Sequence, residues 1–135
     1  MTNIGITGSR GFSNKKLVED TIKLFNKDFT IISGACPNSP DAWAVDVAKQ
    51  LNINYIEYPA KWRVNGVLNK RAGFERNLTI VQESDIVIAF WDTISSGCLD
   101  TINKSIKFKK PLLILIPADT APILQEIMDR LNGID

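Results

Sequence analysis

The sequence predicts an α/β fold, a three-layer domain built on a mostly parallel sheet of about five strands. The first observation is a series of five short runs rich in Ile, Val, Phe or Leu, at residues 3–7, 29–33, 54–58, 86–90 and 112–116. The second is that apolar residues recur at helical spacing between these runs. Because strand and helix alternate five times, right-handed crossovers between parallel strands are the expected connection.

The predicted helices follow the strands in order. Their apolar stripes are Leu17, Val18, Ile22, Leu24 and Phe25; Ala44, Val47, Ala48 and Leu51; Phe74, Leu78 and Val81; Leu99, Ile102 and Ile106; and a last segment over about 121–131. The runs 86–90 and 112–116 are apolar on both faces, which is typical of central strands covered by helices. Residues 59–72 form the one long irregular connection, and loops of this length are usually functional or disordered.

The overall composition narrows the function classes. The chain has 135 residues, close to the commonest domain size, so we expect one domain over residues 1–135. A net charge of +1 speaks against a nucleic-acid polymer as the partner. The N-terminus lacks the pattern of a signal peptide and no apolar run is long enough to span a membrane, so we expect a cytoplasmic protein.

The sequence contains no histidine, which excludes Ser-His and Cys-His dyads and HExxH metal sites. The two cysteines, Cys36 and Cys98, fit neither a disulfide framework nor a zinc site. Both stand on predicted loops, and only Cys98, near a helix start, has a position that could make it reactive. Any chemistry must come from carboxylates, hydroxyls, backbone amides, Arg, Lys or a bound metal with oxygen ligands. We expect no metal site and no cofactor.

Unusual residues gather where the predicted strands end. In open parallel sheets the ligand crevice lies outside the carboxyl ends of the strands. The first strand runs into Gly8, Ser9, Arg10 and Gly11, where glycine lets the backbone approach a ligand and the guanidinium suits phosphate. The alternative is a tight turn with a solvent-exposed Arg10.

The fourth strand leads to Ser96 and Gly97 at the start of a helix, where free amides and the helix dipole favour an anion. Ser96 as a simple helix cap is the alternative. If the first and fourth strands are neighbours, the two glycine turns face each other across the crevice.

The second strand ends at Gly34, and Pro40 is suited to the first turn of the helix that follows. Asp41 next to it either complements the helix dipole or faces the crevice to hold ribose hydroxyls. Arg76 and Asn77, at the start of a later helix, can grip phosphate and read a base edge, or belong to a solvated helix face.

Trp62 and Trp91 both follow strands at the ligand edge, so each could stack on a base or pack in the core. Trp43 lies in a predicted helix and is expected in the core or an interface.

Four motifs occur in an order that resembles a known family. They are GITGSRGF, SGA followed by DAWA, PAKW followed by AGFERN, and IAFWDTISSGCLDTINKSIKFKKPLLIL, spanning about residues 4–116. Together they resemble the YspA/YpsA-related branch of the SLOG superfamily, Rossmann-like domains of bacteria and their phages that are distant relatives of the lysine-decarboxylase-like phosphoribohydrolases. The resemblance implies a Rossmann-like sandwich with a pocket for a nucleotide or a derivative such as an ADP-ribose derivative. The matching positions are Gly8, Ser9, Arg10, Gly34, Asp41, Arg76, Asn77, Ser96 and Gly97.

The chain departs from this family in three places. The pattern GGAxGAD becomes SGACPNSPD, and the loop from Trp62 to Ala72 is longer than in relatives. Where phosphoribohydrolases carry PGGxGTxxE, the chain has SSGCLDT, which puts Thr101 at the position of the catalytic Glu. A threonine cannot stabilise an oxocarbenium-like transition state as a carboxylate does. Asp100 is rotated by about 100° on the helix.

The sequence therefore predicts a protein that binds a small nucleotide or nucleotide-derived molecule, for sensing or sequestering, rather than a nucleic-acid polymer or a membrane. The alternative is a nucleoside-monophosphate N-glycosidase with Asp41 or Asp92 as its carboxylate. Family analogy and the apolar outer helices also suggest a homo-oligomer. The expected ligand-binding residues are Gly8, Ser9, Arg10, Gly34, Asp41, Trp62, Arg76, Asn77, Trp91, Ser96 and Gly97.

Overall fold

Five parallel strands form the central sheet of the computed structural model, which describes residues 2–133. In chain order they are β1 (Thr2–Gly8), β2 (Phe29–Ser33), β3 (Asn54–Glu57), β6 (Ile86–Phe90) and β7 (Leu112–Leu115). Their order across the sheet is β3-β2-β1-β6-β7. The predicted α/β class and the five predicted strands are thus confirmed. The strand order reverses beside β1, which is where a parallel sheet of this kind opens a crevice.

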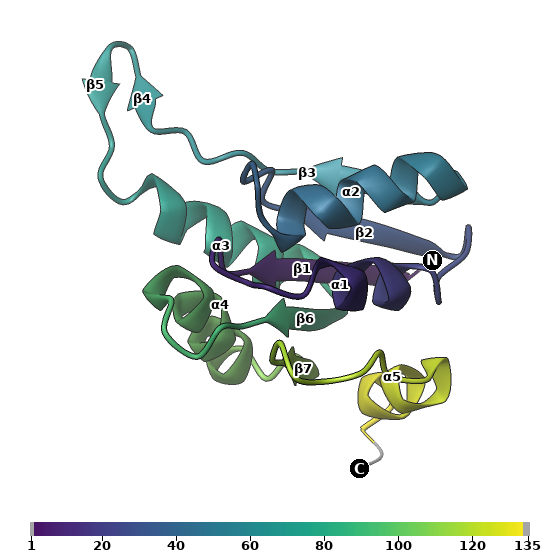
Figure 1. The fold of residues 1–135 in the computed structure, drawn as a ribbon. Helices are drawn as coiled ribbons and strands as arrows, with labels where there is room; N and C mark the ends of the chain where they lie inside the picture. The colour runs from purple at the N-terminus through teal and green to yellow at the C-terminus, as the bar shows by residue number, and fades with distance from the viewer. Residues whose placement is uncertain (1, 134–135) are drawn as a thin grey trace.

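Helices cover both faces of the sheet (Figure 1). They are α1 (Lys15–Ile22), α2 (Pro40–Leu51), α3 (Ala72–Glu83), α4 (Ser96–Lys107) and α5 (Leu124–Leu131). The buried faces of α1, α2 and α5 share one core with Ile88 and Phe90 of β6, whereas Cys98 and Ile102 of α4 pack against Ala89. Because neighbouring residues of a strand point to opposite faces, these contacts separate the two helical layers.

The two strands that the sequence predicts as central differ in position. All five residues of β6 are fully buried, and β1 and β7 pair with it on either side. In contrast, β7 is an edge strand, and Ile114 is 39% exposed. The prediction of a central position is therefore wrong for residues 112–116, because an apolar run does not report how many neighbours its strand has.

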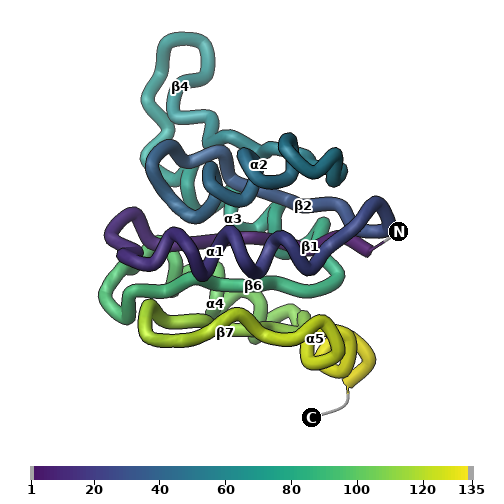
Figure 2. Tube along the Cα trace, turned by 45° about the vertical axis from the view of Figure 1, so that its right-hand side comes forward, coloured from purple at the N-terminus to yellow at the C-terminus, as the bar shows by residue number. Residues whose placement is uncertain are grey.

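The segment 59–72, predicted as irregular, contains a small antiparallel hairpin of β4 (Arg63–Val64) and β5 (Val67–Leu68). Asn65 and Gly66 form its turn with φ angles of 53° and 79°. An Asn-Gly pair is the strongest short-range signal for a two-residue hairpin turn, so this element was readable from the sequence. The hairpin projects away from the sheet and the helices (Figures 1 and 2).

The helix ends differ slightly from the predicted stripes. Helix α1 ends at Ile22, and Phe25 beyond it packs against Phe29 with ring centroids 5.0 Å apart. Over residues 2–133, no helix has the length and apolar character needed to cross a membrane.

Candidate functional site

A crevice of about 290 Å³ opens at the carboxyl ends of β1 and β6. Residues Gly8 and Phe90 are paired there, which confirms that the first and fourth predicted strands are neighbours. Its lining is Thr7, Gly8, Arg10, Gly11, Cys36, Asp41, Arg76, Asn77, Asp92, Ser95, Gly97 and Cys98. Sheet topology thus brings together the end of β1, the segments that follow β1, β2 and β6, and the N-terminal turns of α2, α3 and α4, at the edge where the sequence predicts a ligand.

Arg10 stands at the exposed mouth of the crevice. Its Nε donates a hydrogen bond to Sγ of Cys36 across 3.3 Å, and this contact raises the pKa of the guanidinium, which stays charged. The ion pairs within residues 2–133 join Lys16 to Asp20 and Lys104 to Asp100. Arg10 therefore keeps its positive charge available to an anion.

Asp41 lies in the wall of the crevice and is 5% exposed. Pro40 occupies the first helical position of α2, so Asp41 falls in the first turn, as predicted. Burial raises the pKa of its carboxyl to about 7, an effect that Arg76 and the backbone amides of Gly34 and Gly8 oppose only in part. Its Oδ1 is buried and accepts no hydrogen bond from the residues that the structure describes. Near neutral pH this carboxyl is therefore close to half protonated.

Arg76 and Asn77 tie three parts of the site together. They lie in the second turn of α3 rather than at its start. Nη1 of Arg76 donates to the carbonyl oxygen of Gly34 across 2.6 Å, and its Nε donates to Oδ1 of Asn77 across 3.0 Å. Nδ2 of Asn77 in turn donates to Oδ2 of Asp100 across 3.0 Å. These bonds connect the ends of β2, α3 and α4.

Gly34 lies behind this cluster. A Cβ there would stand 2.6 Å from Nη1 of Arg76 and 2.8 Å from Oδ2 of Asp41, closer than such atoms approach. A side chain at this position would therefore displace Arg76 and Asp41, and Gly34 does not itself line the crevice.

The start of α4 forms another wall. Ser95, not Ser96, is its N-cap, and the Ser95 Oγ accepts from the amide of Cys98 across 3.5 Å. Ser96 is the first helical residue, is exposed, and does not line the crevice. Gly97 does line it, so the first amides of α4, which have no acceptor within the helix, lie beside the cavity.

Ser9 and Asp92 fix the turn that connects β6 to α4. Ser9 is buried, and its Oγ accepts from the amide of Asp92 across 3.1 Å. Oδ1 of Asp92 accepts from the amides of Ile94 and Ser95 at 2.9 and 2.8 Å. Desolvation acts to raise the pKa of Asp92, but these hydrogen bonds and one from Ser9 outweigh it, so the pKa is lowered. Asp92 is therefore ionised and shapes the turn into α4.

The two tryptophans at this edge differ. Trp91 packs against the cluster of Ala89, Cys98 and Ile102, and its Nε1 donates to the carbonyl oxygen of Ser95 across 3.1 Å. Trp91 does not line the crevice, and its contacts are those of a packed side chain. Trp62 is 51% exposed and lies outside the crevice, beside the start of α3.

Cys98 and Thr101 have no reactive setting. Burial raises the pKa of the Cys98 thiol to about 12, so it stays protonated and the predicted reactivity at the helix start does not arise. Thr101 is fully buried, does not line the crevice, and its Oγ1 lacks a hydrogen-bond partner among the described residues. Across residues 2–133, no group of three or more Cys, Asp or Glu side chains is placed to hold a metal ion.

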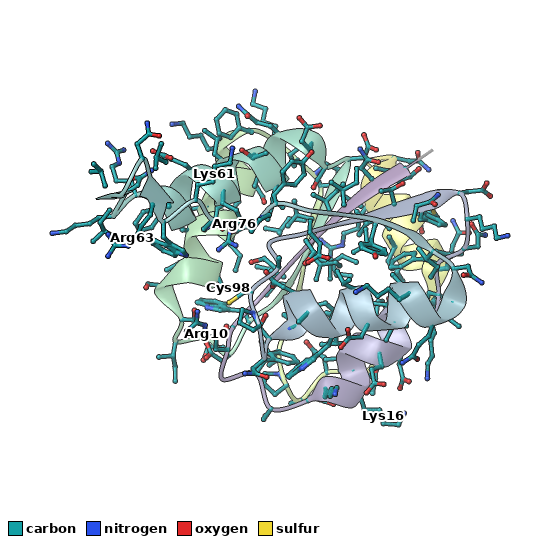
Figure 3. The ribbon with its side chains drawn as sticks, turned by 90° about the horizontal axis from the view of Figure 1, so that it is seen from above. Arg10, Lys16, Lys61, Arg63, Arg76 and Cys98 are labelled. Carbon is teal, nitrogen blue, oxygen red and sulfur yellow. The ribbon has the colours of Figure 1, made fainter. Side chains whose placement is uncertain are left out.

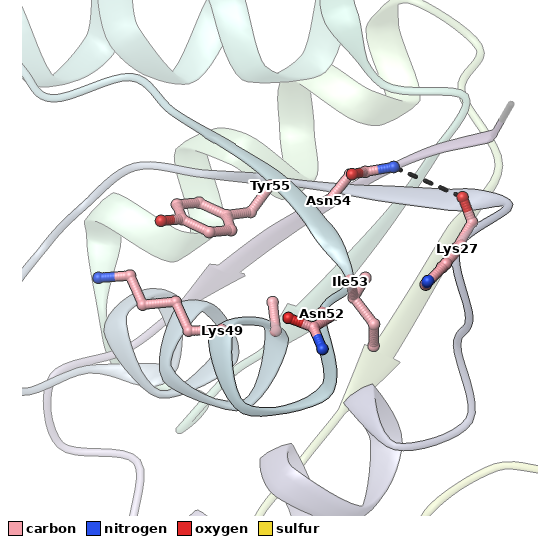
Figure 4. Close-up of a pocket in the computed structure, with 7 residues that line it drawn as sticks. Lys27, Lys49, Asn52, Ile53, Asn54 and Tyr55 are labelled. Atoms are coloured by element: carbon pink, nitrogen blue, oxygen red, sulfur yellow. Dashed lines mark hydrogen bonds between the residues drawn. The ribbon is translucent and has the colours of Figure 1, made fainter.

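A larger hollow of about 720 Å³ lies at the opposite edge of the sheet, by the amino ends of β2 and β3 (Figure 4). Nδ2 of Asn54 donates to the carbonyl oxygen of Lys27 there across 3.5 Å, and the ammonium of Lys49 lies 5.6 Å from the ring centroid of Tyr55. No carboxylate belongs to its lining, which consists of Lys27, Ala48, Lys49, Asn52, Ile53, Asn54 and Tyr55.

Comparison with known proteins gives structural neighbours only. No family model matches the chain, and no curated protein matches it. The structure is similar to DNA processing protein A (DprA) from Streptococcus pneumoniae, with a TM-score of 0.71 and 18% identity over 98% of this chain. It is also similar to DprA from Helicobacter pylori, described as having a unique single-stranded DNA binding mode, with a TM-score of 0.65 and 16% identity over 99% of this chain.

The chain spans 55% of the length of the S. pneumoniae protein and 74% of the H. pylori protein. At these identities the likeness shows the fold, and it agrees with a Rossmann-like arrangement of the sheet and helices.

These neighbours correct five expectations. The similar structures are DNA processing proteins, so the assignment to the YspA/YpsA-related branch is wrong. The predicted small-nucleotide ligand, the ADP-ribose derivative and the hydrolytic alternative are wrong for the same reason, as is the exclusion of a nucleic-acid polymer. A net charge of +1 does not exclude a nucleic-acid polymer, because binding depends on where the charges lie on the surface.

Proposed function

We propose that this chain binds single-stranded DNA along the carboxyl-end edge of its sheet. The observation that carries the proposal is the row of basic side chains at that edge. Figure 3 shows Arg10, Arg76, Lys61 and Arg63 on one side of the molecule, with Lys16 well away from them. A positively charged groove that follows the backbone is the common feature of proteins that bind single strands. The fold shared with DprA supports the same partner.

The crevice is suited to one backbone phosphate. Arg10 supplies a charged fork at the mouth, and the start of α4 at Gly97 supplies amides and the positive end of a helix dipole. Arg76 is held by Gly34 and Asn77, so its charge has a fixed position in the wall. Two carboxyl groups also line the crevice: Asp92 is ionised, whereas burial favours the protonated form of Asp41, so Asp41 adds less negative charge than an ordinary aspartate would.

A single strand fits this site better than a duplex. The crevice is only about 290 Å³, so a flexible strand can bring a phosphate into it, whereas a duplex presents its phosphates on a rigid cylinder. Because Cys36 and Cys98 are free thiols, we place the protein in a reducing compartment, the cytoplasm.

The test is fluorescence anisotropy with a labelled thymidine oligomer of about twelve nucleotides. We expect saturable binding that weakens as salt rises, because phosphate contacts release counterions. Unlabelled single strand should compete, whereas a duplex of the same length and thymidine monophosphate should compete poorly. Absence of binding at low salt, or equal competition by the duplex, would contradict the proposal.

A further inference from the structure

The hairpin β4–β5 has a regular turn and directly follows Trp62 in the chain. Its turn residues Asn65 and Gly66 have the positive φ angles that a two-residue turn requires. Its base is closed by the amide of Asn69, which donates to the carbonyl oxygen of Trp62 across 2.6 Å. The segment that carries Trp62 is therefore held at both sides, by the hairpin and by the start of α3.

Trp62 is the large aromatic residue at this junction. A Cβ added at Gly73 would lie 3.2 Å from Cη2 of the indole, so the ring edge rests on the first turn of α3 where glycine leaves room. The other part of the side chain is open to solvent, since Trp62 is 51% exposed. A ring fixed on one side and open on the other loses little entropy when a flat base stacks on it.

A second pocket lies between the crevice and the segment that carries Trp62, because Lys61, the residue before Trp62, lines it. Its volume is about 360 Å³, and its lining is Tyr58, Pro59, Lys61, Ala72, Glu75, Arg76 and Thr79. Arg76 lines both this pocket and the crevice, so the two cavities adjoin at its side chain. Glu75 contributes the one carboxylate to the pocket, and its Oε2 accepts from Nδ2 of Asn69 across 3.0 Å.

The charges around Trp62 favour a polyanion. Its sequence neighbours are Lys61 and Arg63, and Arg71 precedes α3. Exposed Val64, Val67 and Leu68 on the hairpin could instead serve a protein partner. The basic flanks and the continuity with the crevice favour the single strand, since aromatic rings between cations are the usual way to hold unpaired bases.

We propose that Trp62 is a stacking platform for a base of the strand that leaves the crevice, with Lys61 and Arg63 contacting the adjoining phosphates. This inference rests on the proposed function and adds a second contact point, so it sets the length of strand that the protein engages. In this arrangement one phosphate of the strand binds in the crevice, and the strand then crosses the pocket beside Arg76. A base beyond that pocket stacks on the indole of Trp62.

The test compares Trp62→Ala with Phe108→Ala, which removes another exposed aromatic ring at the far end of α4. We expect Trp62→Ala to weaken binding of the thymidine oligomer about tenfold and Phe108→Ala to leave it within about twofold. Trp62→Phe should retain most of the affinity. Gly73→Ala should weaken binding without removing the ring, because the new methyl group displaces it.

A base-deletion scan separates stacking from a structural role. In the wild type, an abasic residue at one position of the oligomer should cost about as much as Trp62→Ala, and in Trp62→Ala the same abasic residue should cost nothing more. If the losses from Trp62→Ala and from the abasic residue add in full, the platform is wrong. The platform is also wrong, while the crevice proposal stands, if Trp62→Ala behaves like Phe108→Ala and Arg10→Ala still weakens binding. If the wild type binds no single strand, the proposed function itself fails.

Discussion

The two ends of the sheet carry cavities of opposite character. The hollow at the amino ends is more than twice as large, yet its polar lining consists of two lysines, two asparagines and one tyrosine. The smaller crevice at the carboxyl ends holds a buried carboxyl with an unpartnered oxygen, a glycine at a helix start and two arginines. Burial of a titratable group without full compensation destabilises the folded protein, and groups of this kind are concentrated at functional sites. The quality of the lining, not the volume, distinguishes the candidate site.

The largest expected effect concerns the stability cost of Asp41. Between about pH 4 and pH 7, the unfolded chain ionises Asp41 whereas the folded chain keeps it protonated, so the free energy of unfolding falls as the pH rises. For a pKa moved from 3.8 to about 7 the loss is up to about 4 kcal/mol above pH 7. We expect Asp41→Asn to remove this loss and to unfold at higher urea concentration than the wild type at pH 8.

The control for Asp41 is Asp46→Asn, which changes an exposed carboxylate on the same helix. Urea unfolding of the wild type, Asp41→Asn and Asp46→Asn at pH 5 and pH 8 measures how the free energy of unfolding of each protein changes with pH. If Asp41→Asn keeps the wild-type slope, the carboxyl is not held protonated in the folded protein.

The next effect concerns the charge at the crevice mouth. Arg10→Ala should lower the affinity for single-stranded DNA by about 1.5–3 kcal/mol, the usual range for hydrogen bonds to charged groups. The slope of log affinity against log salt should fall by about 0.7, because one phosphate contact is lost. Lys16→Ala is the matched control, since Lys16 is exposed and lies away from the crevice. Equal losses in both variants would mean that the crevice has no special role.

A smaller effect links binding to pH. A phosphate in the crevice favours protonated Asp41, so binding takes up protons and the affinity should fall as the pH rises from 6 to 8, through the pKa of about 7. We expect a change of roughly 1 kcal/mol, the Coulomb energy of two charges about 4 Å apart in water. Anisotropy titrations of the wild type and Asp41→Asn at each pH would measure it. A pH dependence of equal size in both proteins would assign it to another group.

The smallest expected effect is at the larger hollow. Lys49→Ala removes an exposed cation from its rim, and we expect the affinity for DNA and the stability to stay within about 0.5 kcal/mol of the wild type. The same anisotropy and urea measurements suffice. If Lys49→Ala lost as much affinity for DNA as Arg10→Ala, the DNA-binding site would lie at the amino ends of the strands instead of their carboxyl ends.

Much of this architecture could be predicted from residue patterns. The apolar runs and helical stripes were enough for the strands and helices, because local periodicity reports which face of an element is buried. The edge position of β7 and the hydrogen bond from Arg76 to Gly34 could not be predicted in this way, since both depend on which elements become neighbours. The hairpin was missed although its Asn65-Gly66 turn signals it, and the prediction of a single domain remains untested.

The sequence by itself determined the α/β class and the edge of the sheet at which Arg10, Asp41 and Gly97 collect, because parallel strands bring their carboxyl ends to one side. Only the tertiary structure decided which of these side chains are open to a ligand. Ser9 is buried, and Trp91 packs half-buried against Ala89, Cys98 and Ile102. Arg76 is held by Gly34, and Asp41 is buried with an oxygen that accepts no bond from the described residues. The physical reason is that burial and hydrogen bonding are shared among distant segments, which become neighbours only when the chain folds.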